Sequence, residues 1–362
     1  MAAAGAPGAA SLVDEIFGPQ LPPAPPSQPP SDPGSAAAQT PGEQTPIRIV
    51  PGVSRGDQIF RIVLRTAGLS VFAVMGLIAL FLITRGAQAL RATGWSFLTE
   101  QNWQTAVHRF GIGAVLPDGA IIAGIALLIA VPVALAAAVC ISEYAPPGLR
   151  RLLISLVDLM AAVPSIVYGL WGWLFLTPRI IGFESWLSDH FSGVLPFLKV
   201  RNPGIPASFT QSPFIAGVVV ALMVMPIICS LSREVFSQAP TGEREGAYAL
   251  GASRWGMVRT VVLPFARGGM IGAVMLGFGR AMGETIAVAL IISPVFAISS
   301  HPLQAGANSI SSLIALRYGE SDPLALSALM AAGLVLFAIT LVVNMIAAAV
   351  ISRSRSGAAT NE

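Results

Sequence analysis

The sequence predicts an all-α integral membrane protein with six transmembrane helices. Of its 362 residues 54% are apolar and only 11% are charged, whereas a soluble domain usually carries about 25% charged residues. This composition argues against soluble enzymes, DNA readers and secreted disulfide modules. A helix needs about 20 apolar residues to cross a hydrocarbon core ~30 Å thick. Runs of roughly that size lie at residues 67–84, 119–142, 152–177, 213–231, 268–294 and 324–351.

The N-terminal segment, residues 1–46, differs in composition from the rest of the chain. It holds 11 of the 28 prolines, so it cannot bury enough apolar surface to offset the entropy lost on ordering. We expect a disordered Pro/Ala-rich tail there, followed by a pre-membrane segment at 47–66. A signal peptide is not expected, because residues 1–10 offer neither a cation nor an apolar stretch.

The cations between the apolar runs predict the orientation of the chain. Thirteen of the 21 Lys and Arg residues lie on one side of the membrane, in the segments that include both ends of the chain. Seven lie in the segments on the other side, and Arg280 lies inside an apolar run. Because cytoplasmic segments carry the excess of Lys and Arg, both termini, with the tail 352–362 and the segment 232–267, should be cytoplasmic. The net charge of +3 is too small for a nucleic acid partner. Aromatic residues of the outward segments 85–118 and 178–212 should anchor the protein at the lipid interface.

Residue types that usually carry catalysis or bind a cofactor are scarce in the predicted spans. His108, His190 and His301 fall in three different outward segments and lack a metal-binding spacing. The one lysine, Lys199, follows Leu198 and therefore cannot complete the G-x-x-x-x-G-K-[ST] loop that binds ATP. We expect no catalytic site, no metal and no cofactor.

Residues 241–264, ahead of the fifth apolar run, predict a short helix, a glycine corner and a second helix. Acidic residues in the first turn favour a helix at 241–251, and Gly251 stands where a C′ glycine would end it. Ser253 can cap the second helix, which Pro264 should interrupt. The surface open to a partner would comprise Gly246, Ala247, Tyr248, Ala249 and Leu250.

The same segment carries a recognisable spacing. Glu245-Gly246-Ala247, three residues, Gly251, nine residues and Val261-x-Leu263-Pro264 resemble the EAA loop of ABC importer permeases, E-A-A-x3-G-x9-I-x-L-P. Gly246 replaces an alanine of that pattern and Val261 replaces an isoleucine. In this family the loop is the coupling helix that docks on the cytoplasmic ATPase. The resemblance thus implies these ATPase-coupling residues: Glu245, Gly246, Ala247, Gly251, Leu263 and Pro264.

Three further blocks resemble the phosphate permease subunits of this superfamily, the PstC type. They are Glu143-Tyr144-Ala145-Pro146, Pro164-Ser165-Ile166-Val167-Tyr168-Gly169-Leu170-Trp171-Gly172 and Gly277-x-Gly279-Arg280-Ala281-x-Gly283-Glu284-Thr285. The resemblance implies a permease domain at 67–351 with type I ABC importer architecture. It also implies a homologous second permease subunit (PstA type), a cytoplasmic ATPase subunit dimer and an extracytoplasmic phosphate-binding protein as partners, besides the membrane lipid.

Arg280 and Glu284 are charged residues inside the fifth apolar run, where an ion costs at least about 2.5 to 3.5 kcal/mol. Their spacing predicts that they share one face of a helix, one turn apart. Arginine offers a planar fork of donors that fits phosphate oxygens. A carboxylate can accept the proton that phosphate, unlike sulfate, still carries at neutral pH. We expect both residues to line a substrate pathway, and their counterparts in the resembling family are regarded as transport residues.

The sequence therefore predicts a permease subunit of an ATP-driven importer of inorganic phosphate in the cytoplasmic membrane, without an ATPase site of its own. Two transport alternatives remain: a permease for another oxyanion or small solute, and an ion-coupled secondary transporter. In a third alternative, the chain is a membrane scaffold whose Arg280 and Glu284 only hold helices together. Secondary transporters often show two related halves. The EAA-like segment occurs once, which favours the importer.

Overall fold

The computed structural model describes residues 55–104, 109–298, 300–320 and 322–355. The predicted tail at 1–46 lies outside these ranges, as does most of the tail at 352–362. The chain divides into two units, residues 1–62 and 63–362. The described part of the first unit is the start of helix α2 (Arg55–Thr93), which begins inside the predicted pre-membrane segment. There Arg61 Nη2 lies 3.2 Å from Asp57 Oδ2 in an exposed ion pair. All other described elements belong to the second unit.

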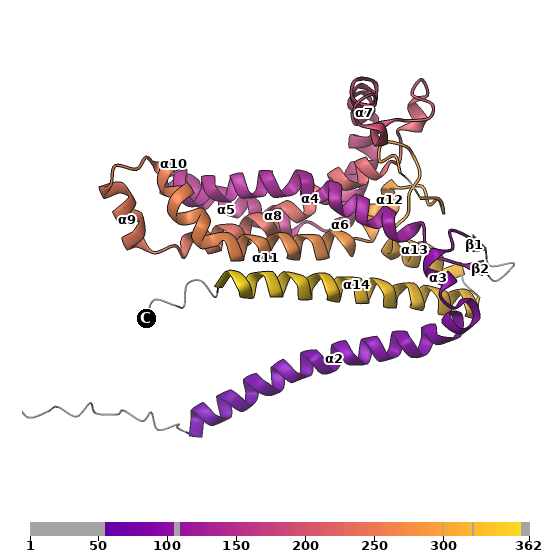
Figure 1. Cartoon of the computed structure of the whole chain (residues 1–362), viewed down its shortest axis with the longest axis horizontal. Coiled ribbons are helices and arrows are strands. Elements are labelled where there is room, and N and C mark those ends of the chain that lie inside the picture. Colours follow the sequence, from indigo (N-terminus) through magenta and orange to yellow (C-terminus); the bar gives the residue numbers. More distant parts are fainter. Residues whose placement is uncertain (1–54, 105–108, 299, 321, 356–362) are drawn as a thin grey trace, which may run out of the picture. The chain divides into compact units, whose positions relative to one another are not determined.

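Three helices form the core of the second unit: α4 (Val115–Val139), α8 (Pro213–Ser237) and α11 (Leu263–Met282). Small residues let them approach closely, as is usual for helices in membranes. On α4 the core face is a row of fully buried alanines at positions 123, 126, 130, 134 and 138. On α11, a Cβ added to Gly277 would lie 2.7 Å from Ile228 Cδ1 of α8. Helix α14 (Pro323–Arg355) runs beside α11 (Figure 1).

Shorter elements gather at the two ends of this core (Figure 1). One end carries α9 (Thr241–Ala249) and α10 (Arg254–Met257). The opposite end carries α3 (Ser96–Thr99), α12 (Ile286–Ile291), α13 (Ile310–Arg317) and a short antiparallel hairpin of β1 (Trp103–Gln104) and β2 (Arg109–Phe110), in which Trp103 pairs with Phe110. The remaining helical segments are η2 (Cys140–Tyr144), α5 (Pro147–Ala162), α6 (Ser165–Trp171), η3 (Gly172–Leu176), α7 (Thr177–Phe191), η4 (Pro196–Leu198), η5 (Pro206–Ser208), η6 (Val258–Val262) and η7 (Tyr318–Glu320).

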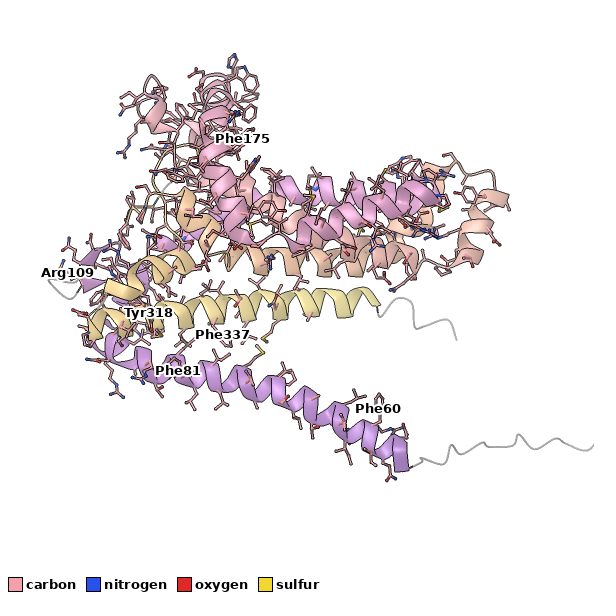
Figure 2. All side chains as sticks on the ribbon, turned by 180° about the vertical axis from the view of Figure 1, so that it is seen from behind. Phe60, Phe81, Arg109, Phe175, Tyr318 and Phe337 are labelled. Carbon is pink, nitrogen blue, oxygen red and sulfur yellow. The ribbon has the colours of Figure 1, made fainter. Side chains whose placement is uncertain are left out.

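Six helical stretches in the described ranges are long and apolar enough to cross a membrane, which confirms the predicted number. They are Gly56–Thr93, Val115–Tyr144, Ser165–Phe191, Pro213–Ser237, Arg254–Met282 and Pro323–Ala349. Large apolar side chains stand exposed along α2, and Figure 2 shows Phe81 on its flank. Such bare apolar surface is what a helix in contact with lipid or another membrane subunit presents.

The predicted bounds of the third span, 152–177, were wrong. Helix α5 ends at Ala162, and a new helical stretch begins at Ser165 and continues through α6, η3 and α7. Between them Val163 is extended, with φ −67° and ψ 128°. Pro164 is the physical reason, because a proline pushes the residue before it out of the helical region.

The predicted bounds of the fifth span, 268–294, were also wrong. The membrane-spanning stretch is Arg254–Met282, and Pro264 does not interrupt it. The π-turn η6 directly precedes α11, and the Leu263 N–H donates to the Val258 carbonyl. A wide turn of this kind accommodates a proline that lacks an N–H. The real break comes at Gly283, before the short helix α12.

Candidate functional site

Arg280 lies in the last turn of α11, and its side chain is exposed. Within the described part of the chain it makes no hydrogen bond and no ion pair. Its neighbour Gly279 faces α14, where the Asn344 Oδ1 atom would lie 3.7 Å from a Cβ on that glycine. The sequence analysis missed Asn344, although an amide inside an apolar helix is itself a signal. α11 therefore presents an exposed arginine that has no acidic partner among the described residues.

Glu284 is buried, 9% exposed, and lies just beyond the end of α11. Its Oε1 accepts a hydrogen bond of 3.4 Å from the Ala287 N–H in the first turn of α12. The prediction that Arg280 and Glu284 share one face of a continuous helix was wrong, because the helix ends at Met282. Among the described residues the two side chains form no ion pair. The structure thus leaves Arg280 exposed and Glu284 buried at a helix break.

A buried polar cluster fixes the segment that carries Glu284. Ser311 Oγ donates to the Glu284 carbonyl oxygen at 2.8 Å, from the first turn of α13. The Asn308 N–H just before α13 donates to Asp118 Oδ2 at 3.2 Å, across 190 residues of sequence. The sequence analysis missed these side chains because each is an ordinary loop or cap residue until the fold brings them together. They connect the helix break to the first turn of α4.

The predicted coupling segment has the local structure that its sequence indicates. Helix α9 ends at Ala249, and Gly251 follows with φ +83°, a conformation that favours glycine. The Gly251 N–H donates to the Tyr248 carbonyl at 2.9 Å, and the Ala252 N–H donates to the Ala247 carbonyl at 3.0 Å. This pair of bonds is a Schellman motif. Ser253 then caps α10 by accepting from the Gly256 N–H at 3.1 Å.

Helix α9 presents most of its surface to solvent. Leu250, at its C-terminal end, is 91% exposed, and Tyr248 is also exposed. Glu245 and Gly246 lie on the same open surface. Ala247 is half-buried against the core, so only part of its surface is open. An exposed leucine and an exposed tyrosine thus lie beside a carboxylate on α9.

The second half of the predicted motif lies in the wall of the bundle. Leu263 is half-buried and packs against the core of α4, α8 and α11. Pro264 is exposed in the first turn of α11. The two halves of the motif are joined by α10 and η6 without a gap. α10, η6 and α11 thus follow one another as one helical stretch, Arg254–Met282.

A further carboxylic acid is buried at the opposite end from α9. Glu184 of α7 is fully buried, and its Oε1 accepts from the Ser212 hydroxyl at 2.7 Å. Ser212 in turn caps α8 by accepting from the Ile215 N–H at 3.2 Å. The sequence analysis treated 178–212 as an aromatic interface segment and missed this pair. It ties α7 to the start of α8.

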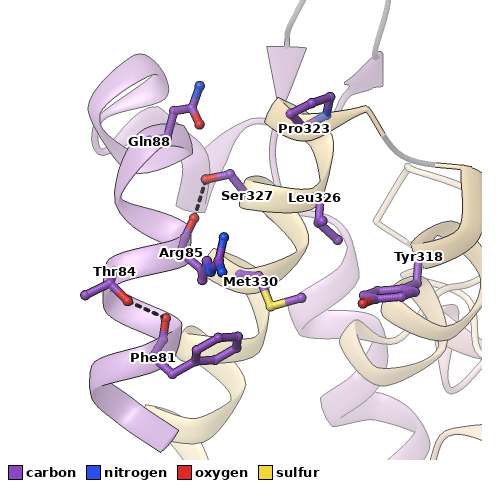
Figure 3. Close-up of a pocket in the computed structure, with 9 residues that line it drawn as sticks. All are labelled: Phe81, Thr84, Arg85, Gln88, Tyr318, Pro323, Leu326, Ser327 and Met330. Atoms are coloured by element: carbon purple, nitrogen blue, oxygen red, sulfur yellow. Dashed lines mark hydrogen bonds between the residues drawn. The ribbon is translucent and has the colours of Figure 1, made fainter. Parts of the chain in front are cut away.

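A surface cavity of about 470 Å³ lies between α2 and α14, away from the predicted path residues. Figure 3 shows Arg85 in this cavity with Met330 next to it, and Tyr318 lines the cavity farther away. The Ser327 hydroxyl donates to the Arg85 carbonyl oxygen at 2.7 Å and so holds the helices together at this level. Neither Arg280 nor Glu284 lines the cavity.

Comparison with known proteins defines the class. Residues 130–356 match the family described as binding-protein-dependent transport system inner membrane component. The chain belongs to this family, as the motifs predicted. It is 39% identical over 300 residues to the phosphate transport system permease protein PstC 2 of Mycobacterium tuberculosis, covering 82% of this chain and 92% of that protein. It is 37% identical over 298 residues to the phosphate transport system permease protein PstC of Haemophilus influenzae, covering 82% and 93%.

Among solved structures, the fold is similar to a bacterial ABC transporter involved in the import of the acidic polysaccharide alginate. The TM-score is 0.52 with 16% sequence identity, and the match covers 82% of this chain and 98% of that chain. At this identity the likeness concerns the fold alone. Together with the family match and the six candidate spans, it confirms the predicted class, an all-α membrane protein with the architecture of an ABC importer permease.

Proposed function

We propose that this chain is a permease subunit of an ATP-driven importer and that inorganic phosphate is its solute. The observation that carries the proposal is Arg280, an exposed arginine on a membrane-spanning helix with no ion-pair partner among the described residues. Ionisable residues inside a membrane are costly and default to a functional role. The similarity to phosphate permeases over 82% of the chain supports phosphate as the anion.

Arg280 and Glu284 have distinct roles in this proposal. The planar guanidinium of Arg280 binds phosphate oxygens and lowers the cost of removing the anion from water. Glu284 accepts a hydrogen bond from the protonated oxygen of the anion, and this bond replaces its long 3.4 Å contact with the Ala287 N–H. Fully ionised sulfate has no proton to offer. The break between α11 and α12 thus lies where protonated and unprotonated oxyanions are distinguished.

Partner subunits complete the path and supply the energy. A closed path for an anion needs a lining on all sides, and Arg280 is exposed, so a second permease subunit of the PstA type covers that face. The exposed surface of α9, around Tyr248 and Leu250, docks on one subunit of a cytoplasmic ATPase dimer. An extracytoplasmic phosphate-binding protein delivers the solute at the opposite end.

This assignment also orients the chain. α9 and both termini lie on the cytoplasmic side, and the Arg-rich segment 232–267 supports this orientation. Residues 67–351 form the permease domain and 241–264 its coupling segment. Residues 1–46 and 352–362 are cytoplasmic tails on either side of it. ATP hydrolysis belongs to the partner subunit.

Co-purification tests the proposal against its alternatives. The full chain is tagged and co-expressed with a PstA-type subunit, an ATPase and a phosphate-binding protein from the same source. We expect the four to purify together, with ATP hydrolysis raised by the phosphate-loaded binding protein. Purification without the ATPase, together with phosphate uptake driven by an ion gradient, would instead identify a secondary transporter. Stimulation by a different oxyanion alone would identify another solute.

A further inference from the structure

The end of α4 meets the coupling segment through two consecutive side chains. Helix α4 continues into the π-turn η2, which ends with Glu143 and Tyr144. π-turns of this kind are frequent at functional sites. Glu143 contacts Arg244 of α9, and Tyr144 lies under the guanidinium of Arg254 at the start of α10. We call these four residues the clasp.

The ion pair of the clasp joins three helices at one guanidinium. Arg244 Nη1 donates to Glu143 Oε2 at 2.9 Å, and Nη2 donates to the carbonyl oxygen of Phe236 in the last turn of α8. The Ser142 hydroxyl occupies the other oxygen of Glu143 at 2.7 Å. The Glu143 side chain is only 4% exposed and that of Arg244 20%. The pair is therefore shielded from water. Away from water, hydrogen bonds between charged groups are strong and directional.

The second contact lies on the other side of the glycine corner. The Arg254 guanidinium carbon is 5.5 Å from the centre of the Tyr144 ring, a cation–π distance. Arg244 precedes Gly251 and Arg254 follows it. Both arms of the corner are thus attached to neighbouring residues at the end of one helix.

Helix α9 has few other attachments to the bundle. Apart from Arg244, Ala247 is the half-buried position among its described residues. An apolar contact through one methyl group permits sliding and rotation, whereas hydrogen bonds from one guanidinium to two helices fix distance and angle. The orientation of α9 relative to α4 and α8 therefore depends on the Glu143–Arg244 pair.

We propose that Glu143 and Arg244 are a positioning pair that transmits movement of the coupling helix α9 to α4, with Arg254 and Tyr144 as the second contact. The proposal rests on the proposed function, because it takes α9 as the helix that docks on the ATPase. It assigns a role to Glu143 and Tyr144, which belong neither to the proposed substrate path nor to the proposed docking surface. Loss of the pair uncouples ATP hydrolysis from movement of phosphate while both partner sites stay intact.

The first measurement does not depend on transport. Hydrogen exchange is followed in α9, residues 241–249, with the full chain in lipid nanodiscs. Glu143→Ala should speed exchange there. Glu143→Gln should speed it less, because its amide oxygen still accepts from Arg244. Glu243→Gln is the control and should leave exchange unchanged. Glu243 is an exposed acid on the same helix, outside the clasp. Unchanged exchange in Glu143→Ala overturns the proposal.

The second measurement is the amount of phosphate moved per ATP hydrolysed by the assembled complex. We expect Glu143→Ala, or Glu143→Gln if the alanine variant does not assemble, to lower this ratio at least about fivefold, the lower end of coupling between sites. The Glu243→Gln complex should match the parent. A normal ratio in assembled clasp variants makes the pair merely structural and overturns the proposal. A parent complex whose ATPase ignores phosphate contradicts the proposed function instead, and the exchange result then still tests the clasp.

Discussion

Arg280 is the residue whose replacement tests the path most sharply. Hydrogen bonds to a charged group are worth about 1.5 to 3 kcal/mol, so Arg280→Ala should lower phosphate uptake about a hundredfold. Arg280→Lys should recover little of the uptake, because the lysine ammonium is a point charge without the planar fork of donors that arginine has. Arg267→Ala is the matched control, an exposed arginine at the opposite end of α11. Uptake is compared at equal levels of assembled complex. Parental uptake in assembled Arg280→Ala would make the residue structural.

Glu284→Gln separates charge from shape at the helix break. The glutamine oxygen can still accept from the Ala287 N–H, so α12 and assembly should be preserved. Without the negative charge, the hydrogen bond from the protonated phosphate oxygen is weaker, so turnover should fall about tenfold or more, equivalent to ~1.4 kcal/mol. The measurement is the uptake rate at saturating phosphate, with complex yield as control. A variant that loses yield and turnover in equal proportion would argue against a transport role.

At the scale of elements, Gly251 tests the corner between α9 and α10. Its φ of +83° is strained for any side chain, and a left-handed residue costs about 1 to 2 kcal/mol. Gly251→Val should misplace α9 and reduce co-purification with the ATPase. Gly242→Val is the control, because Gly242 lies in the same helix with open space around it. Retained complex and retained ATP-driven uptake in Gly251→Val would contradict the docking role of α9.

Helix number and local caps were predictable from the sequence, and two helix bounds were not. Apolar run length determined the six spans, and the Schellman corner at Gly251 depends only on adjacent residues. Apolar composition cannot distinguish one continuous helix from two helices joined by a break. The breaks at Val163 and Gly283 therefore escaped detection, although Pro164 signalled the first.

The candidate site was predictable only in part, because its residue types can be read from the sequence but the end of a helix cannot. Arg280 and Glu284 stood out as charges in an apolar run, but their relative geometry depended on where α11 ends. Arg244 and Glu143 are 101 residues apart in sequence. No local pattern could have paired them. Such a long-range pair can be recognised only once the packing of α4 against α8 is known.

For the whole molecule, the tail at 1–46 should be dispensable. It is Pro-rich and lacks apolar periodicity, so we expect it to add nothing to the core of the permease domain. A chain lacking residues 2–46 should insert and transport phosphate at nearly the parental rate, measured per inserted copy. Normal insertion with lost uptake would show that the tail is a docking arm.

The central claim is that this chain moves phosphate at the expense of ATP. The most direct measurement is phosphate uptake into proteoliposomes that contain the purified complex, with the phosphate-binding protein outside and ATP inside. We predict uptake that requires hydrolysable ATP, selects phosphate over sulfate and persists when ionophores collapse all ion gradients. Uptake that proceeds without ATP and stops with the ion gradient would contradict the account.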